Sequence, residues 1–231
     1  MFTPDFVQDP YRFYADLRTR GDIVFLGGLG KDTWLVPTYE GVATVLDDAS
    51  VPSSGPGALF EQFGLEDRTR LQDFQELLGC ALPFLEPPEH TGWRRVMLKA
   101  FARQHVDAMR ASIVGLADRL LDQAAEWGEF DFIADYANLL PAQVAATLLG
   151  VELADHVRFT VWARDIAAFV GRPTSSIATA ERAQAAALAL HEHLKEIILE
   201  RRRNPRQDAV SLMVAEAAAS AVPLRLLSLL L

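Results

Sequence analysis

The sequence is poor in cysteine, in basic residues and in long apolar runs, and each shortage excludes a class of protein. The only cysteine among its 231 residues, Cys80, rules out a disulfide framework within the chain and fits a reducing compartment. Lysine and arginine total 22 against 31 aspartate and glutamate residues, and the resulting net charge of -9 argues against a nucleic-acid-binding protein. No stretch approaches the roughly 18 apolar residues of a membrane span, and residues 1–20 contain no signal-peptide core. We therefore expect a soluble, cytoplasmic protein that acts without nucleic acid or membrane.

Half of the residues are hydrophobic, which is enough for a large buried core. We expect one domain over residues 1–231, mainly α-helical with a small β-hairpin. The hairpin is predicted where DIVFLGG and TWLVPT flank the turn GLGKD. Short helices are predicted on either side of it, over residues 9–20 between Asp9 and Gly21 and in YEGVATVLDD.

Residues 49–88 differ from the rest, because Pro, Ser and Gly cluster in VPSSGPG and the apolar residues are scattered. We expect a long irregular loop there, with one helix at about residues 69–78. After it the apolar residues recur at helical spacing, apart from EFDF at 129–132, which alternates like a short strand. The run DYANLLPAQVAATLLGV is hydrophobic nearly all round and predicts a buried helix. A long helix is predicted over residues 180–203, after the loop RPTSSIATA at 172–180.

Basic residues gather in one segment, FLEPPEHTGWRRVMLKAF, in spite of the acidic composition. A helix is predicted from Pro88, because proline fits the first helical position and Glu89 suits the helix dipole in the first turn. His90 and Arg94 are four residues apart and therefore share one face of this helix. Their donors can hold a bound carboxylate, since the arginine fork matches its geometry. The alternative is that both are solvated side chains at an exposed helix start.

Three other patterns do not amount to sites. GGLGK lacks the first glycine and the hydroxyl residue of a phosphate-binding loop. HEHLK has Lys195 where a zinc-binding HExxH needs its second histidine, so His191 and His193 are predicted to be surface side chains. Cys80 has no histidine partner in view, and we expect a buried apolar thiol there.

The segment FLEPPEHTGWRRVMLKAF resembles the D-P-P-E-H-T-R-L-R-R segment of the bacterial cytochrome P-450 family, the haem-thiolate monooxygenases. The order of other segments is similar too, with DPYRFYADLRTRGDIVFLG and TWLVPTYEGVATVLDD before it and GEFDFIADYANLLPAQVAATLLG after it. The resemblance covers roughly residues 2–215 and implies the N-terminal portion of the cytochrome P-450 fold. Glu86, Gly92 and Trp93 depart from the family pattern, and Gly92 removes one cation near the expected haem edge.

The resemblance implies haem as the cofactor, with His90 and Arg94 holding its propionates. It also implies an apolar small-molecule substrate, for which Phe84 and Phe169 are pocket candidates, although aromatic residues at helical spacing more often pack in a core. In this family the loop over residues 172–180 belongs to the lid of the pocket. Electrons would come from a redox partner such as a ferredoxin or a reductase.

The chemistry of the family resides in its second half, which has no counterpart in these residues. Neither the acid–alcohol pair nor the Cys loop that supplies the axial thiolate is present, and Cys80 precedes the propionate helix. We therefore expect a partial monooxygenase with no catalytic or metal-binding residue of its own. The apolar end VPLRLLSLLL indicates a chain cut inside a larger fold, with a terminal helix docked on the core as the alternative. The alternative function is a catalytically inactive, P-450-like helical domain that acts as a non-enzymatic partner.

Overall fold

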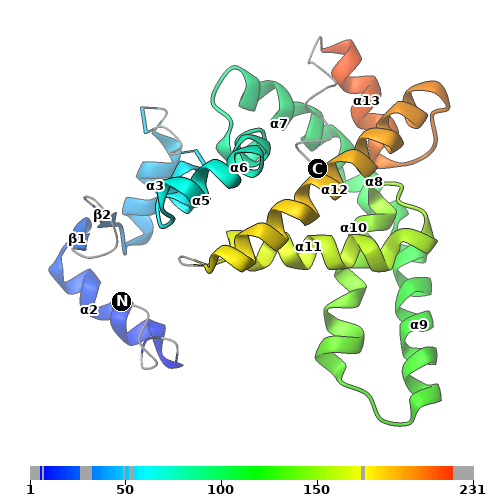
Figure 1. Cartoon of the computed structure of the whole chain (residues 1–231), viewed down its shortest axis with the longest axis horizontal. Coiled ribbons are helices and arrows are strands. Elements are labelled where there is room, and N and C mark those ends of the chain that lie inside the picture. The colour runs from blue at the N-terminus through cyan, green and yellow to red at the C-terminus, as the bar shows by residue number, and fades with distance from the viewer. Residues whose placement is uncertain are drawn as a thin grey trace. The chain divides into compact units, whose positions relative to one another are not determined.

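The computed structural model describes residues 6, 8–26, 33–48, 50–51, 55–172 and 175–220 (Figure 1). The chain divides into two compact units, residues 1–52 and 53–231. The division falls in VPSSGPG, and such Pro- and Gly-rich stretches are typical of domain boundaries. The described residues are mainly helical with one two-stranded sheet, so the predicted fold class is confirmed.

In the described part of the first unit, a helix lies on either side of the hairpin in sequence, as predicted. Helix α2 (Pro10–Arg20) starts at Asp9, whose carboxylate accepts a hydrogen bond from the Arg12 backbone N–H at 3.2 Å. It ends at Gly21, whose φ of 137° is a conformation that favours glycine. Helix α3 (Tyr39–Asp47) closes the unit.

The predicted β-hairpin is present between these helices. Strand β1 (Val24–Leu26) pairs antiparallel with β2 (Thr33–Leu35). Phe25 lies opposite Trp34 with ring centroids 5.1 Å apart, a cross-strand aromatic pair that stabilises the register. The predicted turn GLGKD lies outside the described residues.

Short helices occupy most of the described part of segment 49–88, where we predicted a long irregular loop with one helix. They are α4 (Gly57–Phe60), α5 (Leu65–Arg70), α6 (Gln72–Gly79) and the 3-10 turn η1 (Leu82–Phe84). The predicted helix at residues 69–78 overlaps α6. The others are one or two turns long, too short for apolar residues to recur at helical spacing, so the sequence pattern does not reveal them.

Three helices follow: α7 (Glu89–Ala100), α8 (Arg103–Ala108) and α9 (Arg110–Trp127). Helix α7 begins one residue after Pro88, which is its N-cap. Helix α9 ends at Gly128, as predicted, and the φ of 75° at that position favours a residue without a side chain.

The strand predicted in EFDF is wrong, because residues 129–131 are irregular and Phe132 begins the π-helix η2 (Phe132–Ala137). The carboxylate of Asp131 accepts hydrogen bonds from the N–H groups of Ile133 and Ala134, both at 2.9 Å, and so starts a helical turn. Helix α10 (Leu139–Leu148) follows and is largely half-buried, not fully buried as its composition predicted.

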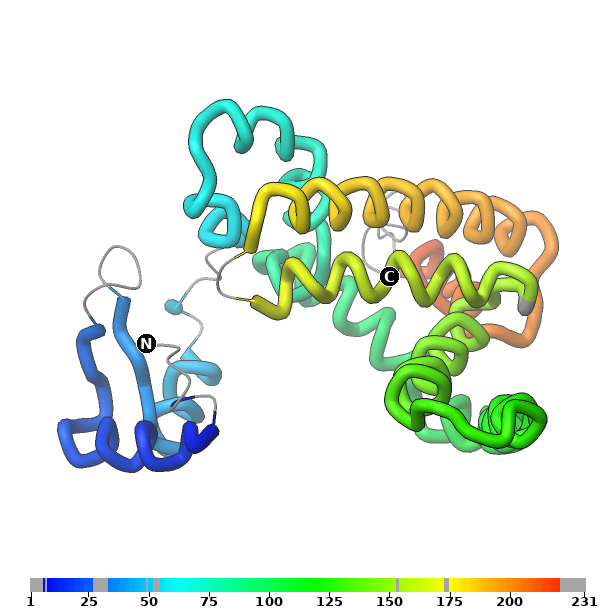
Figure 2. Tube along the Cα trace, turned by 60° about the horizontal axis from the view of Figure 1, so that its bottom comes forward, coloured from blue at the N-terminus to red at the C-terminus, as the bar shows by residue number. Residues whose placement is uncertain are grey.

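A helical hairpin and one further helix complete the second unit. Helices α11 (His156–Val170) and α12 (Ile177–Arg203) lie side by side in both views (Figures 1 and 2). The short turn η3 (Leu153–Asp155) precedes α11, and α13 (Ala209–Ala219) starts at Asp208, as predicted. Helix α12 begins three residues earlier than predicted, so the described part of the predicted lid loop belongs partly to a helix.

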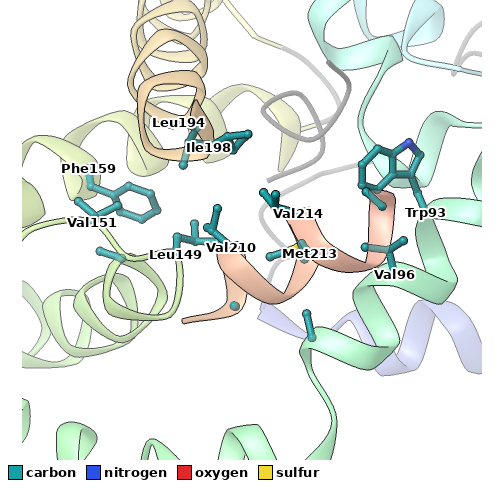
Figure 3. Close-up of a cluster of buried hydrophobic side chains, with 14 residues drawn as sticks. Trp93, Val96, Leu149, Val151, Phe159, Leu194, Ile198, Val210, Met213 and Val214 are labelled. Atoms are coloured by element: carbon teal, nitrogen blue, oxygen red, sulfur yellow. The ribbon is translucent and has the colours of Figure 1, made fainter. Parts of the chain in front are cut away.

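Two clusters of buried side chains form the core of the second unit. In the larger one, α13 packs between α7 and α12 (Figure 3). Its members are Trp93, Val96, Ala100, Ala146, Leu149, Val151, Phe159, Leu194, Ile198, Ala209, Val210, Met213, Val214 and Ala217. The second, the aromatic core cluster, consists of Phe60, Leu71, Phe74, Leu78, Phe169, Ala180, Ala183 and Ala187. Within the described residues, no helix is long and apolar enough to cross a membrane.

Candidate functional site

Helix α7 buries one face and exposes another. Trp93, Val96 and Ala100 are buried in the larger core cluster, which fixes the rotation of the helix about its axis. His90 and Arg94 consequently fall together on a different face, His90 half-buried and Arg94 exposed. This is the arrangement that their spacing predicts.

The two side chains line one open surface pocket of about 460 Å³. The other residues that line it are Thr91, Arg95 and Leu98. Within the described residues, the side chains of His90, Arg94 and Arg95 have no hydrogen-bond or ion-pair partner, and no acidic side chain lines the pocket. The pocket therefore presents unused donors and positive charge to solvent, a composition suited to a carboxylate.

Arg95 and Thr91 are pocket residues that the motif comparison does not single out. Arg95 brings a second guanidinium to the pocket, and the pair of adjacent arginines in the sequence is the signal that could have indicated it. Trp93 lies between Gly92 and Arg94 in sequence and is fully buried, yet its indole N–H has no hydrogen-bond partner in the described part of the chain. A buried donor without a partner carries a free-energy cost of about 1–3 kcal/mol.

The structure brings the two substrate-pocket candidates to one place. Phe169 is 1% exposed, and its ring centroid lies 5.3 Å from that of Phe60 and 5.2 Å from that of Phe74. Phe84 is half-buried and packs against the same aromatic core cluster. Both side chains thus take part in core packing in this structure.

Cys80 is half-buried and follows α6, before the helix that carries His90. Burial raises the pKa of its thiol, and the charge of Glu76 raises it further. A thiol in this environment stays protonated, whereas a metal ligand must be a thiolate. Among the described residues, no three or more His, Cys, Asp or Glu side chains are grouped so that they could hold a metal ion.

The surface position predicted for His191 and His193 is wrong, because α12 lies against α11. Both side chains are half-buried, and the ring of His193 lies 5.7 Å from that of Trp162. The Nε2 atom of His193 is buried without a hydrogen-bond partner among the described residues. These histidines do not form part of the pocket on α7.

Comparisons with known proteins give no match to a family model. The chain is 36% identical over 186 residues to "Mycinamicin IV hydroxylase/epoxidase" of Micromonospora griseorubida, covering 80% of this chain and 43% of that protein. It is 30% identical over 217 residues to "Cytochrome P450 107B1" of Saccharopolyspora erythraea, covering 92% of this chain and 51% of that protein. The solved structure of "Epothilone B-bound Cytochrome P450epoK" superposes with a TM-score of 0.78 at 26% identity, over 99% of this chain and 57% of the other. The chain therefore spans about half the length of the curated relatives that it matches.

Proposed function

We propose that this chain, a relative of the bacterial cytochrome P450s with their fold over about half of their length, is part of a haem-dependent monooxygenase. One observation carries the proposal. His90 and Arg94 lie one turn apart on α7, line a common pocket and have no partner among the described residues. Cofactor carboxylates would supply the missing acceptors.

The residues that are present fit the acidic edge of haem. Every ionisable side chain of the pocket is a donor, and an arginine fork binds a carboxylate oxygen pair with two parallel hydrogen bonds. His90 would bind one propionate through an imidazole N–H, while Arg94 would bind through its guanidinium. Arg95 lines the same pocket and would compensate in part for the cation that Gly92 removes. When bound, haem supplies the iron centre at which O₂ is activated for insertion of one oxygen atom into a substrate.

This chain's other residues have supporting roles in the proposal. Phe84 and Phe169 would form part of the wall against which an apolar small molecule packs, because Phe169 belongs to the aromatic core cluster and Phe84 packs against that cluster. The link between α11 and α12 would act as a hinge of the lid, as loops between lid helices do. Electrons would come from a redox partner such as a ferredoxin or a reductase.

We further propose that these 231 residues by themselves do not form a thiolate-ligated haem protein. The only cysteine in the sequence is Cys80, its pKa is raised by burial, and it lies outside the pocket on α7. Reduced protein with haem and carbon monoxide should therefore lack the Soret band of a thiolate complex. The appearance of that band in the wild type and its loss in Cys80→Ser would contradict this part of the proposal.

The propionate role can be separated from general haem binding with haem dimethyl ester, which lacks free carboxylates. Quenching of tryptophan fluorescence would measure the affinity of the protein for haem and for the ester. We expect the wild type to bind haem more tightly than the ester. His90→Ala and Arg94→Ala should each weaken haem binding about tenfold, the effect of losing one charge-assisted hydrogen bond, and leave ester binding unchanged.

Arg103→Ala is the matched control, since Arg103 lies just beyond α7 with a side chain that is 94% exposed. It should leave the affinity for haem unchanged. Equal affinity of the wild type for haem and for its dimethyl ester would refute the assignment of His90 and Arg94.

A further inference from the structure

Two side chains of α12 hold the segment 57–84 at one residue, Arg70. Arg70 is the last residue of α5, and its guanidinium forms an ion pair with Glu181 of α12. Gln184, three residues further along α12, donates from Nε2 to the carbonyl oxygen of Arg70 at 3.2 Å. These three residues form a polar contact between α5 and α12, which we call the Arg70 seam.

The Arg70 seam borders the aromatic core cluster. Leu71 directly follows Arg70 and Ala180 directly precedes Glu181, and both Leu71 and Ala180 are fully buried in that cluster. A separation of α5 from α12 at the seam would therefore expose the edge of the cluster. Phe169, a candidate wall of the substrate pocket, belongs to the same cluster.

Separation at this end of α12 costs less apolar burial than separation at the other end. Helix α12 contributes Ala180, Ala183 and Ala187 to the aromatic core cluster but Leu194 and Ile198 to the larger cluster. A leucine or isoleucine side chain buries several times the apolar area of an alanine methyl group, and the free energy of burial follows the area. Leu194 and Ile198 therefore anchor α12, while its alanine end can part from α5.

The polar contacts that hold the seam are few and weak. The side chains of Arg70 and Glu181 are 55% and 38% exposed, and exposed ion pairs contribute little stability. One further bond, from the Ser175 N–H to Oε1 of Gln62 at 2.7 Å, holds the link before α12. Against these contacts, Oε1 of Gln184 and Oγ of Ser175 are buried without a partner among the described residues, a cost that water would remove if the seam opened. The polar groups thus favour the closed seam only slightly.

Arg70 also has an acidic partner on its own helix. Its Nη1 lies 3.3 Å from Oδ1 of Asp67, three residues earlier, while its Nη2 contacts Glu181. Asp67 can therefore keep the guanidinium paired after Glu181 is released. Because the Glu181 side chain is already partly exposed, its carboxylate can take up water instead.

We propose that Arg70 is a gate residue, which pairs with Glu181 when the seam is closed and with Asp67 alone when it is open. In the open form α5 parts from the alanine end of α12, and the aromatic core cluster around Phe169 becomes accessible to an apolar small molecule. The helices stay folded in both forms. The role for a substrate rests on the proposed function, whereas the opening is a property of these residues themselves.

The distance between two spin labels would measure the opening. Thr69→Cys on α5 and Ala185→Cys on α12 place labels at exposed, uncharged positions, in a Cys80→Ser background. Double electron–electron resonance should give mainly one short distance at low salt. The fraction of longer distances should rise about fivefold in about 1 M sodium chloride, which screens the pair with Glu181 that only the closed form has. Fivefold corresponds to the loss of about 1 kcal/mol.

Changes to the two acidic partners of Arg70 should act in opposite directions. Glu181→Gln should raise the fraction of longer distances about fivefold at low salt and remove most of its dependence on salt. Asp67→Asn should lower that fraction, because Arg70 then has no alternative partner on α5. Glu192→Gln is the matched control, since it breaks an exposed pair with Lys195 within α12, and it should leave the distances unchanged.

Three outcomes would overturn the proposal. Identical distances in the labelled wild type, at high salt and in Glu181→Gln would show that the seam does not open. A shift in the same direction for Glu181→Gln and Asp67→Asn would refute the switch at Arg70. An equal effect of Glu192→Gln would show a general response to charge. No haem is present in these measurements, so their failure is distinct from a failure of the haem titrations that test the proposed function.

Discussion

Arg201 donates from Nε to Oδ2 of Asp208 at 2.5 Å, although the two residues belong to the end of one helix and the N-cap of the next. The Arg201 side chain is only 4% exposed, and its Nη2 also donates to the carbonyl oxygen of Gly150 at 3.0 Å. Oδ1 of Asp208 accepts from the backbone N–H of Ser211 at 2.8 Å. One carboxylate thus neutralises a buried cation and caps α13.

Asp208→Ala should lower the free energy of unfolding by about 3 kcal/mol. The change removes a helix cap and leaves Arg201 buried with Glu200 as its remaining acidic partner. Urea denaturation followed by circular dichroism would measure the loss. In contrast, Asp107→Ala breaks the exposed pair with Arg103 and should change stability by less than about 0.5 kcal/mol. Equal effects of the two changes would show that burial of the Arg201 pair has no energetic consequence.

The carboxylate of Asp208 should also make the free energy of unfolding depend on pH. Burial alone would raise the pKa of Asp208, but hydrogen bonds from Arg201 and Ser211 outweigh it and hold that pKa below its ordinary value. A carboxyl group whose pKa is lower in the folded state stabilises the fold above its unfolded pKa of about 3.9. This stabilisation is lost as the pH falls from about 3.9 through the pKa of Asp208 in the folded state. The difference in unfolding free energy between the wild type and Asp208→Asn should therefore shrink on acidification, and a difference that stays constant would contradict the prediction.

Gly150→Ala should destabilise the second unit by at least about 2 kcal/mol. Gly150 has a φ of 68°, and a Cβ atom there would stand 2.7 Å from both Nη2 of Arg201 and Oδ2 of Asp208. Thermal denaturation would show the effect. A Cβ atom added at Gly57 meets nothing within 4 Å, so Gly57→Ala should leave the melting temperature nearly unchanged. A Gly150→Ala protein with the wild-type melting temperature would mean that the buried pair rearranges freely.

Phe169→Ala should cost about 3–5 kcal/mol of folding free energy, because the ring is fully buried among Phe60, Phe63 and Phe74. Phe130→Ala removes a ring that is 38% exposed and should cost much less. Chemical denaturation of both variants provides the comparison. Similar losses in the two variants would contradict the prediction that the packing of Phe169 stabilises the second unit.

Local features of the fold could be predicted from the sequence, whereas features that depend on distant segments could not. His90 and Arg94 share a face because helical spacing alone places them there. Arg201 stands in the run ERRR, which is typical of a solvated helix end. It is a buried cation because the folded chain brings it into contact with Gly150 and Asp208.

The same distinction between local and distant interactions explains two wrong predictions. His193 has the sequence surroundings of a surface residue, and it is covered because α11 packs against α12. EFDF alternates like a strand, but the hydrogen bonds of the Asp131 carboxylate to the following N–H groups favour a helical turn.

Helix α12 contributes side chains to both clusters of the second unit. Ala180, Ala183 and Ala187 belong to the aromatic core cluster, while Leu194 and Ile198 belong to the larger one. At 27 residues it is about 40 Å long and behaves as a stiff rod. Unfolding of this helix would remove side chains from both clusters at once. The two clusters should therefore unfold in one cooperative transition, and their backbone amides should exchange with solvent at matching rates.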